Sequence, residues 1–569
     1  MRLSTLSLVS SIAAWLAPVA ISAGQQPQAL HAGDSFDSTL TAGAVHDYQL
    51  RLKAGESANL VVTQKGVDVV VEVRSETGTL VSTFDSPNGR NGPEPVEIVA
   101  DKGGSLTIRV RPFDNREPVG QYHLDVTALR SATATSAMMR ARQLARDSAT
   151  SWLARRSAAI PAGGRVSPRD PLPPLDSLAM QARVLGLGEA THGSREFSDL
   201  RLAITRRLVE RNGYRIVAIE ASTGRLAILN RYIAGELPGG PYVTAALESG
   251  WIGRRAQREL LPWLRQWNAE HPKDRVELVG VDPQDIVVAR DSLRAFLTRA
   301  YGSEFMTRLA PMFAELAAAD SQTLVFGNSD IDSTTRRSIV ELIARLDLDA
   351  PVLIARFGRS QVESASSTAR QLLQFAEFNS NAAGFLNRSR DYYMAANLID
   401  ALSRAGPGAK AVYWAHNAHV AHPEGQSVNA RTAGAWLREW LGCDYRAIAT
   451  SFSEGSFVAQ LPNDLTDRLA TSVLPAAPGE SIDAVLGAIT KDASIAAWPC
   501  RVDSASIPNW LTRPHPMHWV GALFTPGSAP TDSFRPFDLV KAFDGVVHFP
   551  RVTADEMPQD RPLIPGRKP

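Results

Sequence analysis

Polar and apolar residues alternate with a period of two between Leu30 and Ala128. The alternation comes in short segments such as HDYQLRL, VDVVVEV and SLTIRVRP, separated by turn residues at spacings of roughly 8 to 12 positions. Strands of this kind place one face against a core and the other in solvent, as in antiparallel sandwiches. We therefore predict a small all-β jelly-roll sandwich over residues 30 to 128.

The hydrophobic pattern changes at about residue 176, where apolar runs begin to alternate with amphipathic stretches of helical spacing. The expected strands are RVLGLGE, RIVAIEA, VELVGVD, AVYWAH, RAIAT, SFVAQL and DGVVHF. Helical patterns fill the gaps, for example FSDLRLAITRRLVERNG, which ends in glycine. Strands alternating with helices are typical of βαβ units. Residues 176 to 555 are thus predicted to form an α/β domain with a mostly parallel sheet, flanking helices and a helical insertion at about 286 to 405.

The segment between these two regions, residues 129 to 175, is predicted to be a linker. Its first part is rich in Ala and Arg and has apolar residues such as Leu144 and Trp152 at loosely helical spacing, which predicts a connecting helix. Its second part, PAGGRVSPRDPLPPLDS, carries too much Pro and Gly for a helix or strand to continue through it. Two or more domains are also expected from the length of 569 residues, which exceeds what one hydrophobic core usually organises.

The charge balance and the lengths of the apolar runs argue against nucleic-acid and membrane partners. Lys and Arg number 60 against 59 Asp and Glu, so the chain has no overall field that would attract nucleic acid or an anionic membrane. Beyond the N-terminus there is no apolar run long enough for a transmembrane helix. We expect no nucleic-acid partner and no membrane span in the mature chain.

The first residues, MRLSTLSLVSSIAAWLAPVAISAGQQ, combine an early positive charge, an apolar centre and small residues around position 23. This pattern predicts a signal peptide over residues 1 to 23 and a secreted or periplasmic protein. Cys443 and Cys500 are the two cysteines. They allow one disulfide in an oxidising compartment, but their spacing does not decide whether they pair.

Four of the expected strands end in an ionisable residue. These residues are Glu189, Glu220, Asp282 and His416. Ligands of open α/β sheets bind beyond the carboxyl ends of the parallel strands, because the loops there face one crevice. We therefore expect the four side chains to share one site.

Arg201 lies on the apolar stripe of the first predicted helix, together with Phe197, Leu200, Ile204 and Leu208. An inward-facing guanidinium needs a carboxylate partner. Unless its head group reaches solvent, we expect Arg201 to pair with Glu189 or Glu220.

The segment YWAHNAHVAHPEG carries three histidines. His416 and His419, with Glu189 or His192, have residue types that could bind zinc. A strand-end histidine could equally act as a general acid or stabilise an oxyanion. His422, beside a proline in a polar loop, is expected to be exposed.

A nucleophilic serine is not apparent, because the sequence has no G-x-S-x-G elbow. Thr191 and Ser194 lie near His192, at the start of a predicted helix. Small hydroxyl residues at that position more often cap a helix.

The motifs GLGEATHGSREF, VAIEAS, VGVDPQD, RDYYMAANL, VYWAHNAHV and FDGVVHF resemble, in this order, those of the erythromycin esterase family. The resemblance covers about residues 170 to 552. GVDVVVEV, FDSPNG and GPEP resemble pre-peptidase C-terminal-like modules, which implies an accessory or surface-binding role for the N-terminal region.

The esterase resemblance implies hydrolysis of a small-molecule carboxylic ester, including the macrolactone of macrolide antibiotics in some members, by water and without a cofactor or metal. It implies that His192 is the general base, with Glu189, Glu220, Arg201 and His416 completing the catalytic set. His419 is the second choice among the histidines of its motif and is placed with the substrate-binding residues. Asp282, Arg390 and Asp391 are also expected to contact substrate.

Two alternatives remain open at this point. The same Glu and His residues could hold a divalent metal that generates hydroxide. The chain could also be an exported binding protein on a hydrolase fold that has lost its activity.

Overall fold

The computed structural model describes residues 27–86, 88–160, 166, 170–240, 243, 246, 255–326, 331–379, 390–426, 430–462, 469–527 and 533–556. The predicted signal peptide lies outside these residues. The chain divides into two compact units, Met1–Gln143 and Leu144–Pro569. No helix of the described part is both long enough and apolar enough to cross a bilayer.

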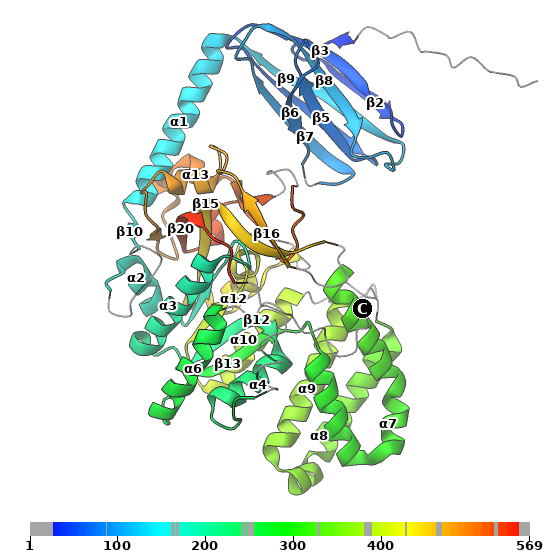
Figure 1. The fold of residues 1–569 in the computed structure, drawn as a ribbon, viewed down its shortest axis with the longest axis vertical. Coiled ribbons are helices and arrows are strands. Elements are labelled where there is room, and N and C mark those ends of the chain that lie inside the picture. The colour runs from blue at the N-terminus through cyan, green and yellow to red at the C-terminus, as the bar shows by residue number, and fades with distance from the viewer. Residues whose placement is uncertain are drawn as a thin grey trace, which may run out of the picture. The chain divides into compact units, whose positions relative to one another are not determined.

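The first unit contains two sheets built from short strands (Figure 1). The strands are β1 (Gln28–Ala29), β2 (Ser35–Leu40), β3 (His46–Leu52), β4 (Ser57–Lys65), β5 (Val69–Arg74), β6 (Leu80–Phe84), β7 (Asn91–Val99), β8 (Gly104–Pro112) and β9 (Gly120–Arg130). One sheet has the order β1-β3-β8-β5-β6 and the other β2-β9-β4-β7. Apolar residues from both sheets, such as Leu50, Val71 and Leu124, form one core. The period-two alternation is explained by this shared core.

The second unit is built on one large mixed sheet with the order β10-β17-β20-β15-β11-β14-β12-β13, with β16 paired to β15. Its strands are β10 (Ser157–Ala159), β11 (Val184–Leu187), β12 (Ile216–Ser222), β13 (Glu277–Asp282), β14 (Ala411–Trp414), β15 (Tyr445–Gln460), β16 (Leu469–Leu474), β17 (Ser494–Ala497) and β20 (Gly545–Val552). The pairings from β20 across to β13 are parallel. Those of β10, β16 and β17 are antiparallel. A small hairpin, β18 (His515–His518) with β19 (Phe534–Phe537), stands apart.

One strand prediction is wrong. RAIAT and SFVAQL are parts of the single strand β15, although glycine separates them in the sequence. Gly455 has φ of 142°, and a Cβ atom there would lie 2.1 Å from the carbonyl oxygen of Val552. Glycine at position 455 therefore lets β15 approach β20 closely, and the strand continues through it.

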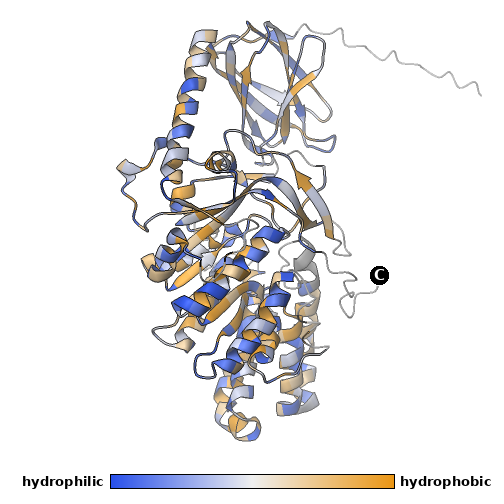
Figure 2. Ribbon diagram, turned by 60° about the vertical axis from the view of Figure 1, so that its left-hand side comes forward, coloured by the Kyte–Doolittle hydropathy of each residue, from blue (hydrophilic) through white to orange (hydrophobic). Residues whose placement is uncertain are grey.

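The helices are α1 (Ala132–Ala154), α2 (Pro173–Gln181), α3 (Arg195–Asn212), α4 (Thr223–Ile233), α6 (Arg255–Glu270), α7 (Val287–Phe326), α8 (Ser333–Phe357), α9 (Arg359–Phe378), α10 (Arg390–Ala405), α11 (Asn417–Val420), α12 (Ala433–Leu441), α13 (Ile482–Gly487) and α14 (Leu539–Ala542). Several of them cover the two faces of the large sheet. Helices α2, α3, α4 and α6 pack on one face. The end of α1 packs on the other face with α10 and α12 to α14. Figure 2 shows polar and apolar residues alternating along these helices, as this half-buried packing requires.

The predicted helical insertion divides between two cores. Helices α7, α8 and α9 share a core of their own and lie side by side (Figure 1). Helix α10 instead packs on the sheet through Met394, Ala395 and Leu398, while Tyr393 joins the core of α7 to α9. This helix therefore connects the insertion to the strand ends.

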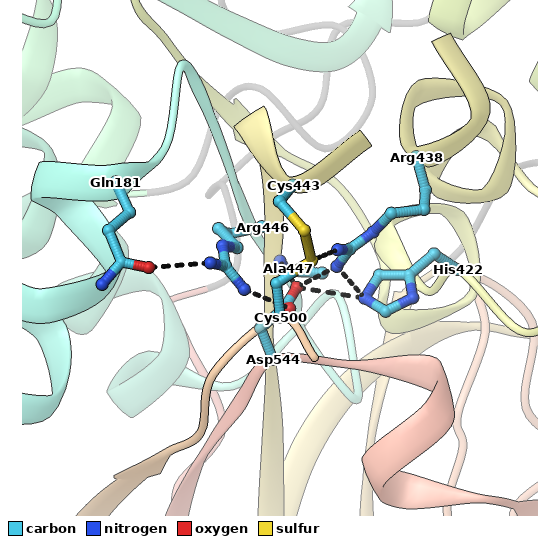
Figure 3. Close-up of a disulfide and its surroundings, with 8 residues drawn as sticks. All are labelled: Gln181, His422, Arg438, Cys443, Arg446, Ala447, Cys500 and Asp544. Carbon is cyan, nitrogen blue, oxygen red and sulfur yellow. Dashed lines mark hydrogen bonds and ion pairs between the residues drawn. A yellow bond between two sulfur atoms is a disulfide. The ribbon is translucent and has the colours of Figure 1, made fainter. Parts of the chain in front are cut away.

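Cys443 and Cys500 form a disulfide with Cα atoms 5.8 Å apart, next to the buried carboxylate of Asp544 (Figure 3). Asp544 is paired with Arg438, Arg446 and His422. The expectation that His422 is exposed is wrong, because its side chain is 9% exposed. A buried carboxylate needs partners of this kind.

Candidate active site

Four neighbouring strands of the large sheet, in the order β11, β14, β12 and β13, bring the predicted strand-end residues to one edge. Glu220 lies in β12 and Asp282 is the last residue of β13. Glu189 and His416 each follow their strand by two residues. The backbone N–H of His416 donates to Oε2 of Glu220 at 2.8 Å. The carboxyl ends of these strands thus carry all four residues.

His192 and Glu189 form a hydrogen-bonded pair in the loop between β11 and α3. Nδ1 of His192 lies 2.7 Å from Oε1 of Glu189, and the two side chains are 11% and 9% exposed. Because a carboxylate can only accept, the neutral imidazole carries its proton on Nδ1 and its lone pair on Nε2. This is the tautomer that a general base needs when it takes a proton through Nε2.

Arg201, on α3, holds the other oxygen of the same carboxylate. Its Nη1 lies 2.7 Å from Oε2 of Glu189, so Arg201 is paired as expected and does not reach solvent. Its guanidinium also lies over the ring of Trp414, 5.3 Å from the centroid. Burial alone would raise the pKa of Glu189, but Arg201 and His192 hold that pKa below its usual value.

The loop that carries His192 is held against β15 by its glycine. A Cβ atom on Gly193 would lie 1.9 Å from the carbonyl oxygen of Val458, so only glycine fits there. Ser194 occupies the N-cap position of α3 but makes no capping bond through its side chain. Its hydroxyl instead lies 2.7 Å from that of Thr191. The capping expected of these hydroxyls is replaced by a bond between them within the loop.

His416 is buried and bonded to backbone at both ring nitrogens. The N–H of Ala418 donates to Nδ1 at 3.2 Å. Nε2 lies 3.1 Å from the carbonyl oxygen of Val520 and 3.3 Å from that of Ala190. Burial, together with the proximity of His192, lowers the pKa of His416 to about 3. A neutral His416, with both nitrogens occupied, is suited to positioning the loop of His192, whose ring centroid is 5.1 Å away.

His419 lies between two carboxylates. Its Nδ1 is 2.8 Å from Oδ1 of Asp391, and its Nε2 is 3.3 Å from Oε1 of Glu220. Burial opposes the charged form, but Asp391 and Glu220 together raise the pKa of His419 to about 10. His419 is therefore a cation at neutral pH.

Arg390, the first residue of α10, joins Asp282 and Glu220. Its Nη2 is 2.6 Å from Oδ2 of Asp282 and 2.9 Å from Oε1 of Glu220. Burial would raise the pKa of Glu220, but His419, Arg390 and His192 hold it well below the usual value. The four residues predicted to contact substrate, Asp282, Arg390, Asp391 and His419, thus form one ion-pair network with Glu220.

The charges of the site nearly cancel. The four carboxylates of Glu189, Glu220, Asp282 and Asp391 face the three cations Arg201, Arg390 and His419. Apart from His192, these groups sum to one net negative charge.

Within the described residues, no group of three His, Cys, Asp or Glu side chains is arranged to hold a metal ion. Glu189 and Glu220 are paired with arginine or histidine instead.

Two residues near the site were missed in the sequence. Trp519 meets the ring of His416 edge-on, with centroids 4.9 Å apart. Val520 donates its N–H to the carbonyl of Ala190 at 2.9 Å. The surrounding PMHWVG has no periodicity or motif that would have placed it beside the histidines.

Two erythromycin esterases of Escherichia coli are similar to part of this chain in sequence. The chain is 25% identical to erythromycin esterase type I of Escherichia coli over 295 residues, which are 48% of this chain and 71% of that protein. It is 22% identical to erythromycin esterase type II of Escherichia coli over 315 residues, 52% of this chain and 74% of that protein.

Two solved structures have the same fold. A Bacillus cereus protein superposes with a TM-score of 0.58 at 22% identity, covering 73% of this chain and 99% of its own. A mutant of the erythromycin esterase EreC in its open conformation has a TM-score of 0.50 at 21% identity, covering 68% of this chain and 94% of its own.

The family model described as erythromycin esterase matches residues 209–552. Glu220, Asp282, Arg390 and His416 lie inside this match, and His192 with its partners lies before it. Since the match covers more than half of the chain, the protein belongs to the erythromycin esterase family.

Proposed function

We propose that this protein hydrolyses carboxylic esters by activating water with His192. The observation that carries the proposal is the chain of contacts from Arg201 through Glu189 to Nδ1 of His192. It fixes the tautomer and the orientation of a base at the edge of the sheet where ligands of such folds bind. The family relationship supports an ester as the substrate.

In the proposed reaction, Nε2 of His192 takes a proton from water as the water oxygen attacks the ester carbonyl carbon. The imidazolium is stabilised by Glu189 directly and by the field of Glu220. The imidazolium then gives its proton to the leaving alkoxide as the C–O bond breaks, which regenerates neutral His192. Positioned general-base catalysis contributes about 10² to 10⁴-fold.

The negative charge that develops on the carbonyl oxygen is stabilised by the cation Arg390 and by the field of the His419 imidazolium, whose two N–H groups are donated to Asp391 and Glu220. Both are held in fixed positions by carboxylates, so they need no reorganisation when the charge appears. Glu220, His416, Asp282 and Asp391 act as positioning residues for these groups. Macrolactones are included in the proposed substrate class, because the relatives carry the name erythromycin esterase.

We also propose that the protein is exported to an oxidising compartment and that the first unit has an accessory or surface-binding role. The signal-like first 23 residues support export. The pairing of Cys443 with Cys500 supports it independently.

The test is a panel of p-nitrophenyl esters and macrolides incubated with the purified protein, with and without EDTA. Release of acid and alcohol that is unaffected by EDTA supports the proposal. If activity is lost with EDTA and recovered on adding metal, activation of water by His192 without a metal ion is rejected. Failure to cleave any ester would reject the proposed function.

A further inference from the structure

A cavity of about 820 Å³ lies beside the histidines. It is bounded by α11 and the loop that follows it, by the residues that flank β18, by β19, and by α14. The walls are mainly apolar and include Ala418, Pro423, Trp519 and Phe537. Its volume and lining are those of a small-molecule site.

The cavity adjoins the candidate active site through Trp519 and Ala418. The Trp519 ring, which lines the cavity, meets the His416 ring edge-on at 4.9 Å, and His416 in turn contacts the His192 ring. Ala418 lines the cavity and bonds to His416 through its N–H. The rings of Trp519 and His416 thus lie between the cavity and the proposed base.

The inner wall is held in place by an aromatic contact and a backbone hydrogen bond. Trp519 stacks on Phe537, with centroids 4.9 Å apart and an interplanar angle of 25°. The N–H of Trp519 donates to the carbonyl of Ser533 at 2.7 Å. A wall held in this way can bind an apolar group without first becoming ordered.

The charged residues of the cavity balance one another. Glu424 and Asp538 are acidic, and Arg535 and Lys541 are basic. Lys541 pairs with Asp538 at 2.8 Å. A cavity with balanced charges and apolar walls favours an uncharged, apolar occupant.

We infer that this cavity is the subsite for a bulky apolar group, acyl or alcohol, of a neutral ester, and that Trp519 and Phe537 contact that group. The inference rests on the proposed hydrolase function and specifies its substrate class. An acetyl or methyl group would leave most of the cavity unfilled. Esters with longer chains should therefore be preferred, with kcat/KM rising about fourfold for each added methylene until the cavity is filled.

The experiment compares Phe537→Ala with Phe524→Ala. Phe524 is a matched control because it is also half-buried but packs on Phe457 and does not line the cavity. Two ester series separate the sources of the apolar group: p-nitrophenyl alkanoates lengthen the acyl chain, and n-alkyl acetates lengthen the alcohol.

Phe537→Ala should reduce kcat/KM about tenfold for the long members of one series and leave the shortest ester unchanged. Phe524→Ala should leave the whole profile unchanged. If short esters are cleaved but the dependence on chain length is the same in both variants, the subsite is rejected and the hydrolase function stands.

If no ester is cleaved, the proposed function fails and binding decides the subsite. The probe is decanamide, titrated calorimetrically into the three proteins. Weaker binding to Phe537→Ala than to wild type and Phe524→Ala supports the subsite. Equal binding to all three, or no binding to wild type, overturns it.

Discussion

The Nδ1 atom of His192 lies 2.7 Å from Oε1 of Glu189. Glu189→Gln keeps the shape of the side chain but removes the charge, and its amide can present a donor to the imidazole and so select the wrong tautomer. We expect kcat to fall by roughly 10² to 10⁴-fold with little change in KM. Steady-state kinetics on a short ester measures both constants. A kcat close to that of wild type would mean that Glu189 does not orient the base.

Arg201 is the buried partner of Glu189, with 5% of its side chain exposed. Arg201→Met preserves most of the volume but leaves a buried carboxylate without its cation, a change that costs roughly 3–5 kcal/mol. The pKa of Glu189 should rise, because burial is then opposed mainly by His192. The acid limb of the pH–rate profile should therefore move to higher pH.

Denaturant unfolding and a pH–rate profile test both expectations. Arg231→Met is the control, because the Arg231 to Glu236 pair is largely exposed and such pairs contribute little. If Arg201→Met were as stable to denaturant as Arg231→Met, the expected loss of stability from the unpaired Glu189 would be contradicted.

The titration of His419 should make the folded protein less stable at alkaline pH. Its pKa is raised to about 10 in the folded protein and is about 6.5 when unfolded. The stabilisation it provides is thus fully present below pH 6.5 and is lost as the pH rises through 10. The melting temperature should fall between pH 7 and 10, and His419→Gln should reduce that fall.

His515→Gln provides the comparison for the same melting series. Burial lowers the pKa of His515, so its titration affects stability below pH 6.5. The alkaline fall should therefore be unchanged in His515→Gln. A similar fall in wild type and His419→Gln would show that His419 is not the group responsible.

The disulfide between Cys443 and Cys500 closes a loop with a sequence separation of 57. Removing a bridge of this kind lowers the free energy of unfolding by roughly 2–4 kcal/mol. Dithiothreitol should lower the denaturation midpoint of wild type, whereas a Cys443→Ala/Cys500→Ala variant should start low and not respond. A midpoint that does not move on reduction would argue against a stabilising bridge.

The strand-end rule predicted that Glu189, Glu220, Asp282 and His416 lie together, because each closes an apolar run. The position of Arg201 on an apolar stripe predicted its ion pair with Glu189. The role of His192 as the base came only from the family resemblance and stays a prediction. Local patterns could not show that His416 bonds to backbone at both nitrogens, since one partner, Val520, is 104 residues away. His422 was misjudged for the same reason, because its partner Asp544 is 122 residues away.

Hydrolysis of a short p-nitrophenyl ester by His192→Ala tests the central claim most directly. His515→Ala, a histidine variant outside the site, serves as the control, and circular dichroism checks that both variants are folded. We predict that His192→Ala lowers kcat by at least about 10²-fold, while His515→Ala keeps the wild-type rate. Equal rates for wild type and a folded His192→Ala would contradict the assignment of His192 as the base.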